Sequence, residues 1–211
     1  MDLAGHIAVG RTGELGALGS GRLPKPFNDH MHRVIEPALA LPAGSAILDA
    51  GCGAGGVARW LAEQGAHHVL GADVELPLSA ATGGPVPVHG GGTVELRRCD
   101  LLDLSTDRPY DAVLLLGVLH YAGSAEGVHR MLGAADRLAV PGAPLALSWI
   151  CDEITLTYEE AFLPGRELVL GTLAALGREP VDLWARDVRH AHGGSPEHEH
   201  RIVYGVWRRA R

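Results

Sequence analysis

The sequence has few cysteines, one lysine and no long apolar run. The three cysteines among its 211 residues are Cys52, Cys99 and Cys151. Thiols so few and so widely spaced exclude a disulfide framework and a cysteine-rich zinc site. The absence of any run of about 18 apolar residues excludes a membrane-spanning helix. The first residues lack the basic segment and apolar core of a secretory signal, so we expect a cytoplasmic protein without a membrane partner.

Positive charge is also scarce. Lys25 is the single lysine, and the formal net charge is −7. Because nucleic-acid backbones attract basic surfaces, this balance argues against a nucleic-acid partner. Hydrophobic residues make up 46% and charged residues 20% of the chain, which is typical of a globular protein. The length suits one domain with short appendages.

We expect residues 1–45 to form an N-terminal arm and helix that act as a lid, and residues 46–211 to form the core domain. The first 26 residues are glycine-rich and have little periodicity. A helix is predicted after Pro26, with Asn28 as its N-cap. Residues 151–165 are the second candidate for a substrate lid, because they follow a strand at the edge of the sheet where functional loops gather.

From Ala46 onward, short apolar runs alternate with helical patterns. Strands are predicted at 46–50, 68–73, 94–99, 111–117 and 144–150, and helices at 55–64, 124–139 and 166–177. This alternation predicts an α/β, doubly wound, mostly parallel sheet with helices on both faces. Prolines and glycines in residues 75–92 predict that the helix after the second strand is short or absent.

Two strand-like runs, 181–192 and 198–207, are separated by a short loop and therefore predict a hairpin. The last strand of a seven-stranded sheet would then run antiparallel to its neighbours. His190, His192, His198 and His200 flank the hairpin loop, where they could contact substrate, bind a metal or form an exposed tip. No cysteine or aspartate completes a known metal spacing, so no metal is expected. His67 and His68, before the second strand, are expected at the surface.

The densest signal is the glycine loop after the first strand, in residues 47–56. Glycines allow a tight turn and a close approach of ligand, and the following helix presents free N–H groups. Gly51, Gly53 and Gly56, with Asp73 about 20 residues further on, also fit a dinucleotide fingerprint. Ligands of such sheets bind at the carboxyl ends of the strands.

Acidic residues mark the ends of three consecutive strands: Asp49, Asp73 and Asp100. A carboxylate at Asp49 would repel a pyrophosphate but suits an ammonium group. A cationic ligand with hydroxyl groups and an adenine could use all three carboxylates, and S-adenosylmethionine is such a ligand.

With these motifs the sequence resembles the class I, Rossmann-like S-adenosylmethionine-dependent methyltransferases over about residues 46–150. The resemblance implies S-adenosylmethionine as cofactor and S-adenosylhomocysteine as product. It implies cofactor contacts from Asp49, Gly51, Cys52, Gly53, Gly55, Asp73, Val74, Asp100, Leu101 and Gly117.

The roles implied by the resemblance differ along the cofactor. Asp73 would hold the ribose hydroxyls, and Val74 would pack on the adenine. Asp100 would contact the adenine amino group, with Leu101 beside it. The Gly117 carbonyl would face the methionine ammonium.

His120 and Tyr121 end the fourth predicted strand, beside the expected position of the methyl group. A neutral histidine can accept a proton at neutral pH, so this pair is the catalytic candidate. A role in shaping the pocket is the alternative. Because the sulfonium methyl is already electrophilic, placement of the nucleophile supplies most of the catalysis.

The leading hypothesis is transfer of a methyl group to an oxygen or nitrogen atom of a small molecule, for example in natural-product biosynthesis. The alternatives are a peptide N-methyltransferase, a non-catalytic S-adenosylmethionine-binding module and an NAD-dependent oxidoreductase. The oxidoreductase predicts a hydride-transfer pair such as tyrosine–lysine, and it is disfavoured because Lys25, the single lysine, precedes the sheet.

Overall fold

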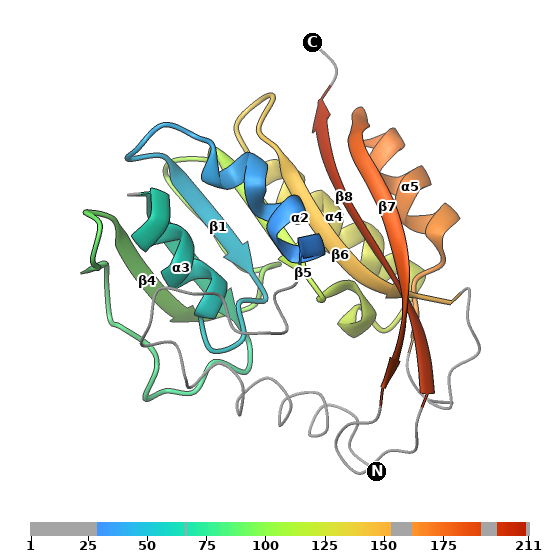
Figure 1. The fold of residues 1–211 in the computed structure, drawn as a ribbon, viewed down its shortest axis with the longest axis horizontal. Helices are drawn as coiled ribbons and strands as arrows, with labels where there is room; N and C mark the ends of the chain where they lie inside the picture. Colours follow the sequence, from blue (N-terminus) through green and yellow to red (C-terminus); the bar gives the residue numbers. More distant parts are fainter. Residues whose placement is uncertain (1–28, 66, 153–161, 191–197, 210–211) are drawn as a thin grey trace.

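A computed structural model describes residues 29–65, 67–152, 162–190 and 198–209. They form one eight-stranded sheet in the order β3-β4-β2-β1-β5-β6-β8-β7, with helices on both faces (Figure 1). The predicted doubly wound α/β architecture is confirmed. No helix in the described part of the chain is long and apolar enough to cross a membrane.

The middle of the sheet is parallel. Its strands are β1 (Ala46–Ala50), β2 (His68–Asp73), β4 (Thr93–Arg98), β5 (Ala112–Leu116) and β6 (Leu145–Cys151). β1, β2, β5 and β6 are mostly buried, because helices cover both faces of a parallel sheet. Their carboxyl ends meet at one edge, as the sequence predicts.

The sheet has one strand more than the seven predicted. β3 (Val86–Pro87) pairs antiparallel with β4, and two residues are too short to produce an apolar alternation in the sequence. β3 is the one regular element between β2 and β4. The prolines and glycines of this segment therefore exclude a helix there, as expected.

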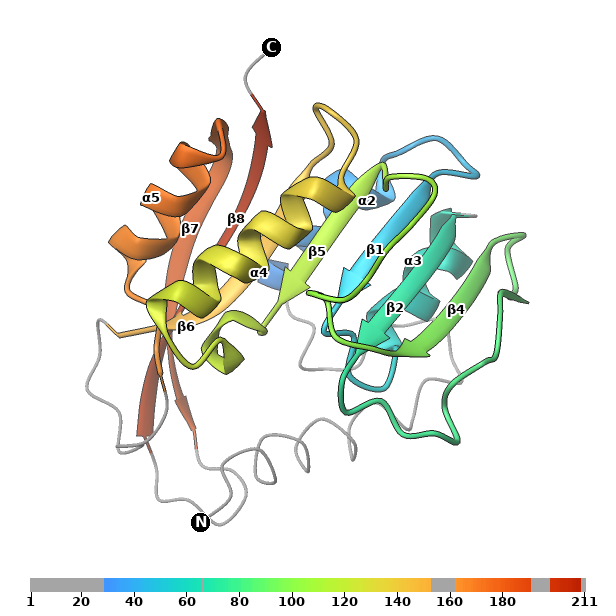
Figure 2. The same cartoon turned by 180° about the vertical axis from the view of Figure 1, so that it is seen from behind.

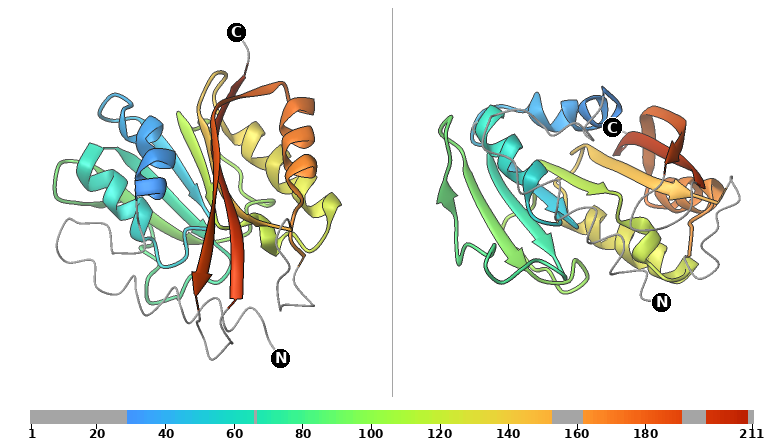
Figure 3. Two further views of the ribbon diagram at one scale, coloured as in Figure 1. Left: turned by 45° about the vertical axis from the view of Figure 1, so that its right-hand side comes forward. Right: turned by 60° about the horizontal axis from the view of Figure 1, so that its bottom comes forward.

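The predicted hairpin consists of β7 (Arg178–His190) and β8 (His198–Arg209). β8 runs antiparallel to both β6 and β7 and lies between them. β6 ends where Cys151 pairs with Arg201, so the hairpin extends beyond the carboxyl end of β6 (Figure 3). β7 begins three residues earlier than the predicted run.

In the described part of the chain, four helices cover the sheet. α2 (Asp29–Leu39) and α3 (Gly56–Gly65) lie on one face, and α4 (Ala125–Leu138) and α5 (Arg166–Ala175) on the other (Figures 1 and 2). α2 packs through Val34, Ile35 and Ala38. The predicted cap Asn28 and the N-terminal arm lie outside the described residues, as does most of the 151–165 loop.

The expectation that both His67 and His68 are exposed is wrong for His67. Its side chain is fully buried, and its Nε2 lies 3.3 Å from the carbonyl oxygen of Leu39. A Cβ on Gly65 would overlap the imidazole ring, so a glycine at this position makes room for the histidine. His68 is exposed, as expected.

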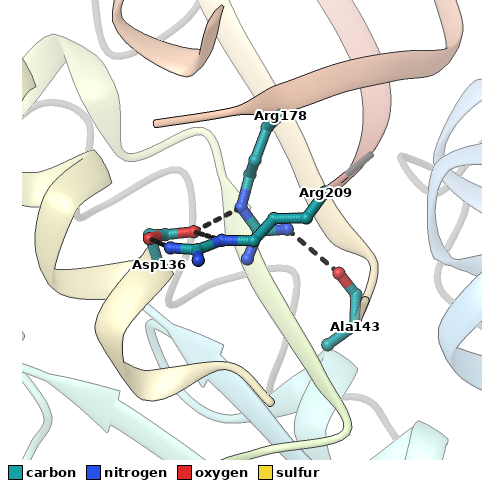
Figure 4. Close-up of polar contacts among 4 residues, drawn as sticks. All are labelled: Asp136, Ala143, Arg178 and Arg209. Atoms are coloured by element: carbon teal, nitrogen blue, oxygen red, sulfur yellow. Dashed lines mark hydrogen bonds and ion pairs between the residues drawn. The ribbon is translucent and has the colours of Figure 1, made fainter. Parts of the chain in front are cut away.

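An ion-pair cluster around the buried residues Asp136 and Arg178 joins the hairpin to α4 at the opposite edge of the sheet (Figure 4). Asp136 on α4 accepts a 2.7 Å hydrogen bond from Arg178, with which it forms an ion pair. It forms a second ion pair with Arg209. Arg178 also donates to the Ala143 carbonyl at 3.0 Å. Burial opposes ionisation of Asp136, but the two arginines outweigh it and lower its pKa. The cluster thus joins the start of β7 and the end of β8 to α4.

Candidate functional site

A pocket of about 290 Å³ lies at the carboxyl ends of β1, β2 and β4 and is closed by the segment from β5 to α4. This is the edge at which ligands of open α/β sheets bind. Seven of the predicted site residues line it: Gly51, Gly53, Asp73, Val74, Asp100, Leu101 and Tyr121.

The glycine loop is fixed by backbone geometry that other residues rarely adopt. Gly51, Gly53 and Gly55 have φ values of +73°, +55° and +82°. A Cβ on Gly51 would overlap the Val118 side chain. The Gly51 N–H also donates to the Ala72 carbonyl at 2.7 Å, which fastens the loop to β2. The loop therefore offers the pocket a floor formed by the backbone of Gly51 and Gly53 and the small side chain of Ala54.

Asp73 connects this loop to the segment after β2. One carboxylate oxygen accepts the Gly53 N–H at 2.7 Å, and the other accepts the Glu75 N–H at 2.8 Å. Each carboxylate oxygen has a further lone pair. Asp73 lines the pocket with both oxygens held in place, so it can accept two more hydrogen bonds from a pair of neighbouring hydroxyls.

The other end of the pocket combines a carboxylate with apolar walls. Asp100 follows β4, and one of its oxygens accepts the Leu102 N–H at 2.8 Å. Leu101 is buried, whereas Val74 is 54% exposed. A flat heteroaromatic ring with an amino group fits this combination of apolar wall and acceptor.

The charges of the lining favour a cationic ligand. Asp73, Glu75 and Asp100 supply three carboxylates, and Arg130 is the single basic side chain of the lining. A glycine floor, a fixed acceptor for hydroxyls and a surplus of carboxylates fit the adenosyl and sulfonium groups that the resemblance predicts. The described residues of the pocket therefore suit S-adenosylmethionine.

Four predicted cofactor residues do not line the pocket. Asp49 is 2% exposed within β1. Gly55 is the last residue before α3, and Gly117 has a φ of +65° and donates its N–H to the Ser148 carbonyl. Burial and the nearby carboxylates of Asp49 and Asp73 raise the pKa of the Cys52 thiol, so Cys52 stays protonated and non-nucleophilic.

The two catalytic candidates, His120 and Tyr121, differ in whether they line the pocket. Both lie in a short 3₁₀ helix, η1 (Leu119–Tyr121), after β5. Tyr121 is 42% exposed and lines the pocket. His120 is not part of the lining, and its ring packs against that of Tyr121 with centroids 4.3 Å apart. Tyr121 is thus the member of the pair that faces the pocket.

Sequence analysis missed the contribution of α4. Gly127, Arg130 and Met131 line the pocket, and their i, i+3 and i+4 spacing places them on one face of that helix. A Cβ on Gly127 would overlap the Ala122 carbonyl, so the glycine lets α4 approach the preceding loop. The spacing was visible in the sequence, but the rotation of α4 was not.

The histidine hairpin is partly described. His190 and His198 are opposite each other in the β7–β8 register, and His200 pairs with Val188. His200 is 3% exposed and thus not part of an exposed tip. His192 and the loop lie outside the described residues. Within the described ranges, no group of three or more histidine, cysteine, aspartate or glutamate side chains could hold a metal.

Part of this region is similar to a known family of proteins. Residues 47–142 match the family model described as a methyltransferase domain. "Probable tRNA methyltransferase 9B" of Bos taurus is 29% identical over 119 residues, which cover 56% of this chain and 24% of the bovine protein. The S-adenosyl-L-methionine-dependent Diels-Alderase iccD of Talaromyces variabilis is 33% identical over 132 residues, covering 59% of this chain and 44% of iccD. The match spans less than half the length of either curated relative.

Among solved structures, the N-methyltransferase NodS from Bradyrhizobium japonicum WM9 has the same fold. It aligns with a TM-score of 0.65 at 18% identity, covering 89% of this chain and 98% of NodS. Its complex with S-adenosyl-l-homocysteine aligns with a TM-score of 0.63 at 18% identity, covering 98% of this chain and all of that one.

Proposed function

The chain carries a class I, S-adenosylmethionine-dependent methyltransferase domain, and from this premise we propose that it transfers a methyl group to an oxygen or nitrogen atom of a small molecule. S-adenosylmethionine is the cofactor of this family, and S-adenosylhomocysteine is the product. The observation that carries the proposal is the pocket at the carboxyl ends of β1, β2 and β4, where Asp73 and Asp100 face a glycine floor.

The proposed cofactor contacts follow from the geometry of the described residues. Asp73 accepts hydrogen bonds from the ribose hydroxyls. It uses the carboxylate lone pairs that do not accept the Gly53 and Glu75 N–H groups. Asp100 accepts a hydrogen bond from the adenine amino group, and Val74 and Leu101 pack against the adenine ring. Asp49 and Gly117 act from the strand ends on the methionine side, Asp49 through its negative charge.

The bound cofactor supplies an electrophilic methyl group, so the chain has to place an acceptor atom and remove its proton. His120 is the proposed base, because a neutral imidazole can accept a proton and His120 lies in η1, directly after β5. Tyr121 shapes the pocket beside it and fixes the plane of the imidazole through their ring contact. An amine acceptor needs to arrive neutral, whereas a hydroxyl acceptor depends on the base.

A small acceptor agrees with the charge of the chain. The formal net charge of −7 disfavours an RNA substrate, although a curated relative is named as a tRNA methyltransferase. The match to a Diels-Alderase that depends on S-adenosyl-L-methionine supports a second candidate: a cofactor-bound cyclase that consumes no methyl group.

The test has two stages. Calorimetry should detect binding of S-adenosylmethionine and S-adenosylhomocysteine but not of NAD. Incubation with methyl-labelled S-adenosylmethionine and separate pools of small phenols, small amines, peptides and tRNA should then label a small molecule. Label in tRNA alone would overturn the choice of acceptor class, and cofactor binding without label in any pool would favour the cyclase.

A further inference from the structure

Arginine side chains on α2, β7 and β8 are paired with carboxylates in four cases. Arg33 binds Asp182, Arg201 binds Asp187, and both Arg178 and Arg209 bind Asp136. Arg186 on β7 differs, because its one hydrogen bond in the described structure runs from Nε to the Tyr204 hydroxyl at 3.2 Å. Its guanidinium is half-buried and retains four unused N–H donors.

Tyr204 is held rigidly beside this guanidinium. Its ring stacks on Trp184 at 5.5 Å with an interplanar angle of 7°, and on His30 from α2 at 5.6 Å. Trp184 is itself fixed by a 2.9 Å hydrogen bond to His30 Nδ1 and by Arg33, which lies 4.1 Å from the ring centroid. The hydroxyl of the 2% exposed Tyr204 therefore has a fixed position.

The Tyr204 hydroxyl still has its own proton to donate, because in its hydrogen bond with Arg186 it is the acceptor. A guanidinium can only donate, so the hydroxyl accepts from Arg186 and keeps its own proton for another acceptor. The described part of the chain supplies no acceptor for that proton. Arg186 and Tyr204 together thus present N–H and O–H donors with no carboxylate between them.

The face of the hairpin that carries these donors has little negative charge. Side chains two residues apart share a face of a strand, so Arg186 lies with Asp182, Trp184 and Val188 on β7, and Tyr204 lies with His200 and Ile202 on β8. Trp184, Ile202 and Tyr204 pack with α2 on this side. Asp182 is the single acidic group among the described residues of this face of the hairpin, and Arg33 binds it.

The register places these donors at the ligand-binding edge. Arg186 pairs with Ile202, which pairs with Ile150, one residue before β6 ends. β7 is separated from β5 by β6 and β8, so the backbone of Arg186 is roughly 14 Å from the end of β5 at ordinary strand spacing. A group bound here would be the far end of an acceptor whose reacting atom lies beside β5.

We propose that the Arg186 guanidinium and the Tyr204 hydroxyl form a binding site for an anionic oxygen group, a carboxylate or a phosphate, at the end of the methyl acceptor remote from its reacting atom. This assignment to the acceptor rests on the proposed function, whereas the affinity of the site for an anion does not. The acceptor is accordingly an elongated molecule with a terminal negative charge.

The test uses two simple anions in place of the acceptor. Inorganic phosphate and succinate are titrated separately by calorimetry into the full chain, with sodium chloride holding the ionic strength constant. Saturable binding of either anion is expected, and the preferred one identifies the terminal group. Arg186→Met keeps the apolar stem and should weaken this binding at least about tenfold, because a hydrogen bond to a charged group is worth 1.5–3 kcal/mol. Tyr204→Phe, which keeps the ring stack, should weaken it less.

Two controls keep the outcome interpretable. Arg137→Met removes an exposed arginine of α4 and should leave anion binding unchanged. Arg186→Lys keeps the positive charge and should retain part of the affinity if Arg186→Met fails to fold. Equal binding by the wild type and Arg186→Met, or no saturable binding by the wild type, would overturn the site. S-adenosylhomocysteine binding, measured on the same samples, reports separately on the proposed function.

Discussion

The Asp73 carboxylate accepts the backbone N–H of Gly53 at 2.7 Å, so the acidic residue that ends β2 is fastened to the glycine loop that follows β1. One side chain therefore both shapes the floor of the pocket and supplies acceptors to a ligand. Replacing it affects the loop and the ligand together, and the first prediction separates the two effects.

Asp73→Asn should weaken S-adenosylhomocysteine binding at least about tenfold in calorimetry, because hydrogen bonds to a charged group are worth 1.5–3 kcal/mol. Asp73→Ala should weaken it further and also lower the unfolding free energy by about 1 kcal/mol, since the Gly53 and Glu75 N–H groups lose their acceptor. Unchanged affinity in both variants would contradict the ribose role.

Gly51→Ala should lower both stability and cofactor affinity. Its φ of +73° costs a non-glycine residue about 1–2 kcal/mol, and the added Cβ would also overlap Val118. Gly44→Ala is the matched control, because Gly44 has a φ of +81° but open space around its Cβ. Urea unfolding should show a smaller loss for Gly44→Ala, with unchanged binding. Equal losses in both variants would show that the contact with Val118 is unimportant.

Arg130→Ala should weaken binding of S-adenosylhomocysteine and of 5′-methylthioadenosine by the same factor, about two- to fivefold. Arg130 lines the pocket and is exposed. We expect its guanidinium to lie over the adenine ring, a contact worth about 0.5–1 kcal/mol at an exposed site. A loss confined to S-adenosylhomocysteine would instead place Arg130 at the methionine carboxylate. Arg137→Ala on the same helix serves as the control.

His120→Gln should lower kcat about 10²- to 10⁴-fold once an acceptor is identified, which is the ordinary contribution of a positioned base. The dissociation constant for S-adenosylhomocysteine should stay the same, because His120 is not part of the pocket lining. A variant with full turnover would reject His120 as the base and favour its role in holding Tyr121.

Asp136→Asn should lower the unfolding free energy by about 3–5 kcal/mol at pH 7, because Arg178 would keep a buried charge without its partner. The pKa of Asp136 is lower in the folded chain than in the unfolded chain, so its stabilisation is complete above the unfolded value and is lost as pH falls through the folded value. The difference between variant and wild type should therefore shrink at acidic pH in urea titrations. Asp187→Asn, which breaks an exposed pair, should change stability little at either pH.

Sequence patterns predicted the elements that depend on local chemistry. The apolar runs located every strand of the parallel sheet, and Asp73 and Asp100 were placed in the pocket because parallel strands end at one edge. Asp49 is the penultimate residue of β1, yet its side chain is 2% exposed and does not line the pocket. Position along a strand determines the edge that a residue reaches, but the face and the neighbouring side chains determine whether it reaches the ligand.

Features that depend on packing between distant segments were not predicted. His67 is buried because Gly65 leaves room for its ring, and two residues so close in sequence give no sign of that contact. Arg130 faces the pocket because of how α4 is rotated on the sheet. The stack of His30, Tyr204 and Trp184 joins segments more than 150 residues apart, from α2 and the hairpin.

The position of β8 between β6 and β7 has a consequence for how the chain reaches its native state. β7 is synthesised before β8 but has no hydrogen-bonding partner in the sheet except β8. A nascent chain that has emerged only as far as β7 leaves the edge of β6 open to aggregation. β7 can therefore join the sheet only together with β8 or after it, so completion of this edge depends on the long-range pairing of β6 with β8.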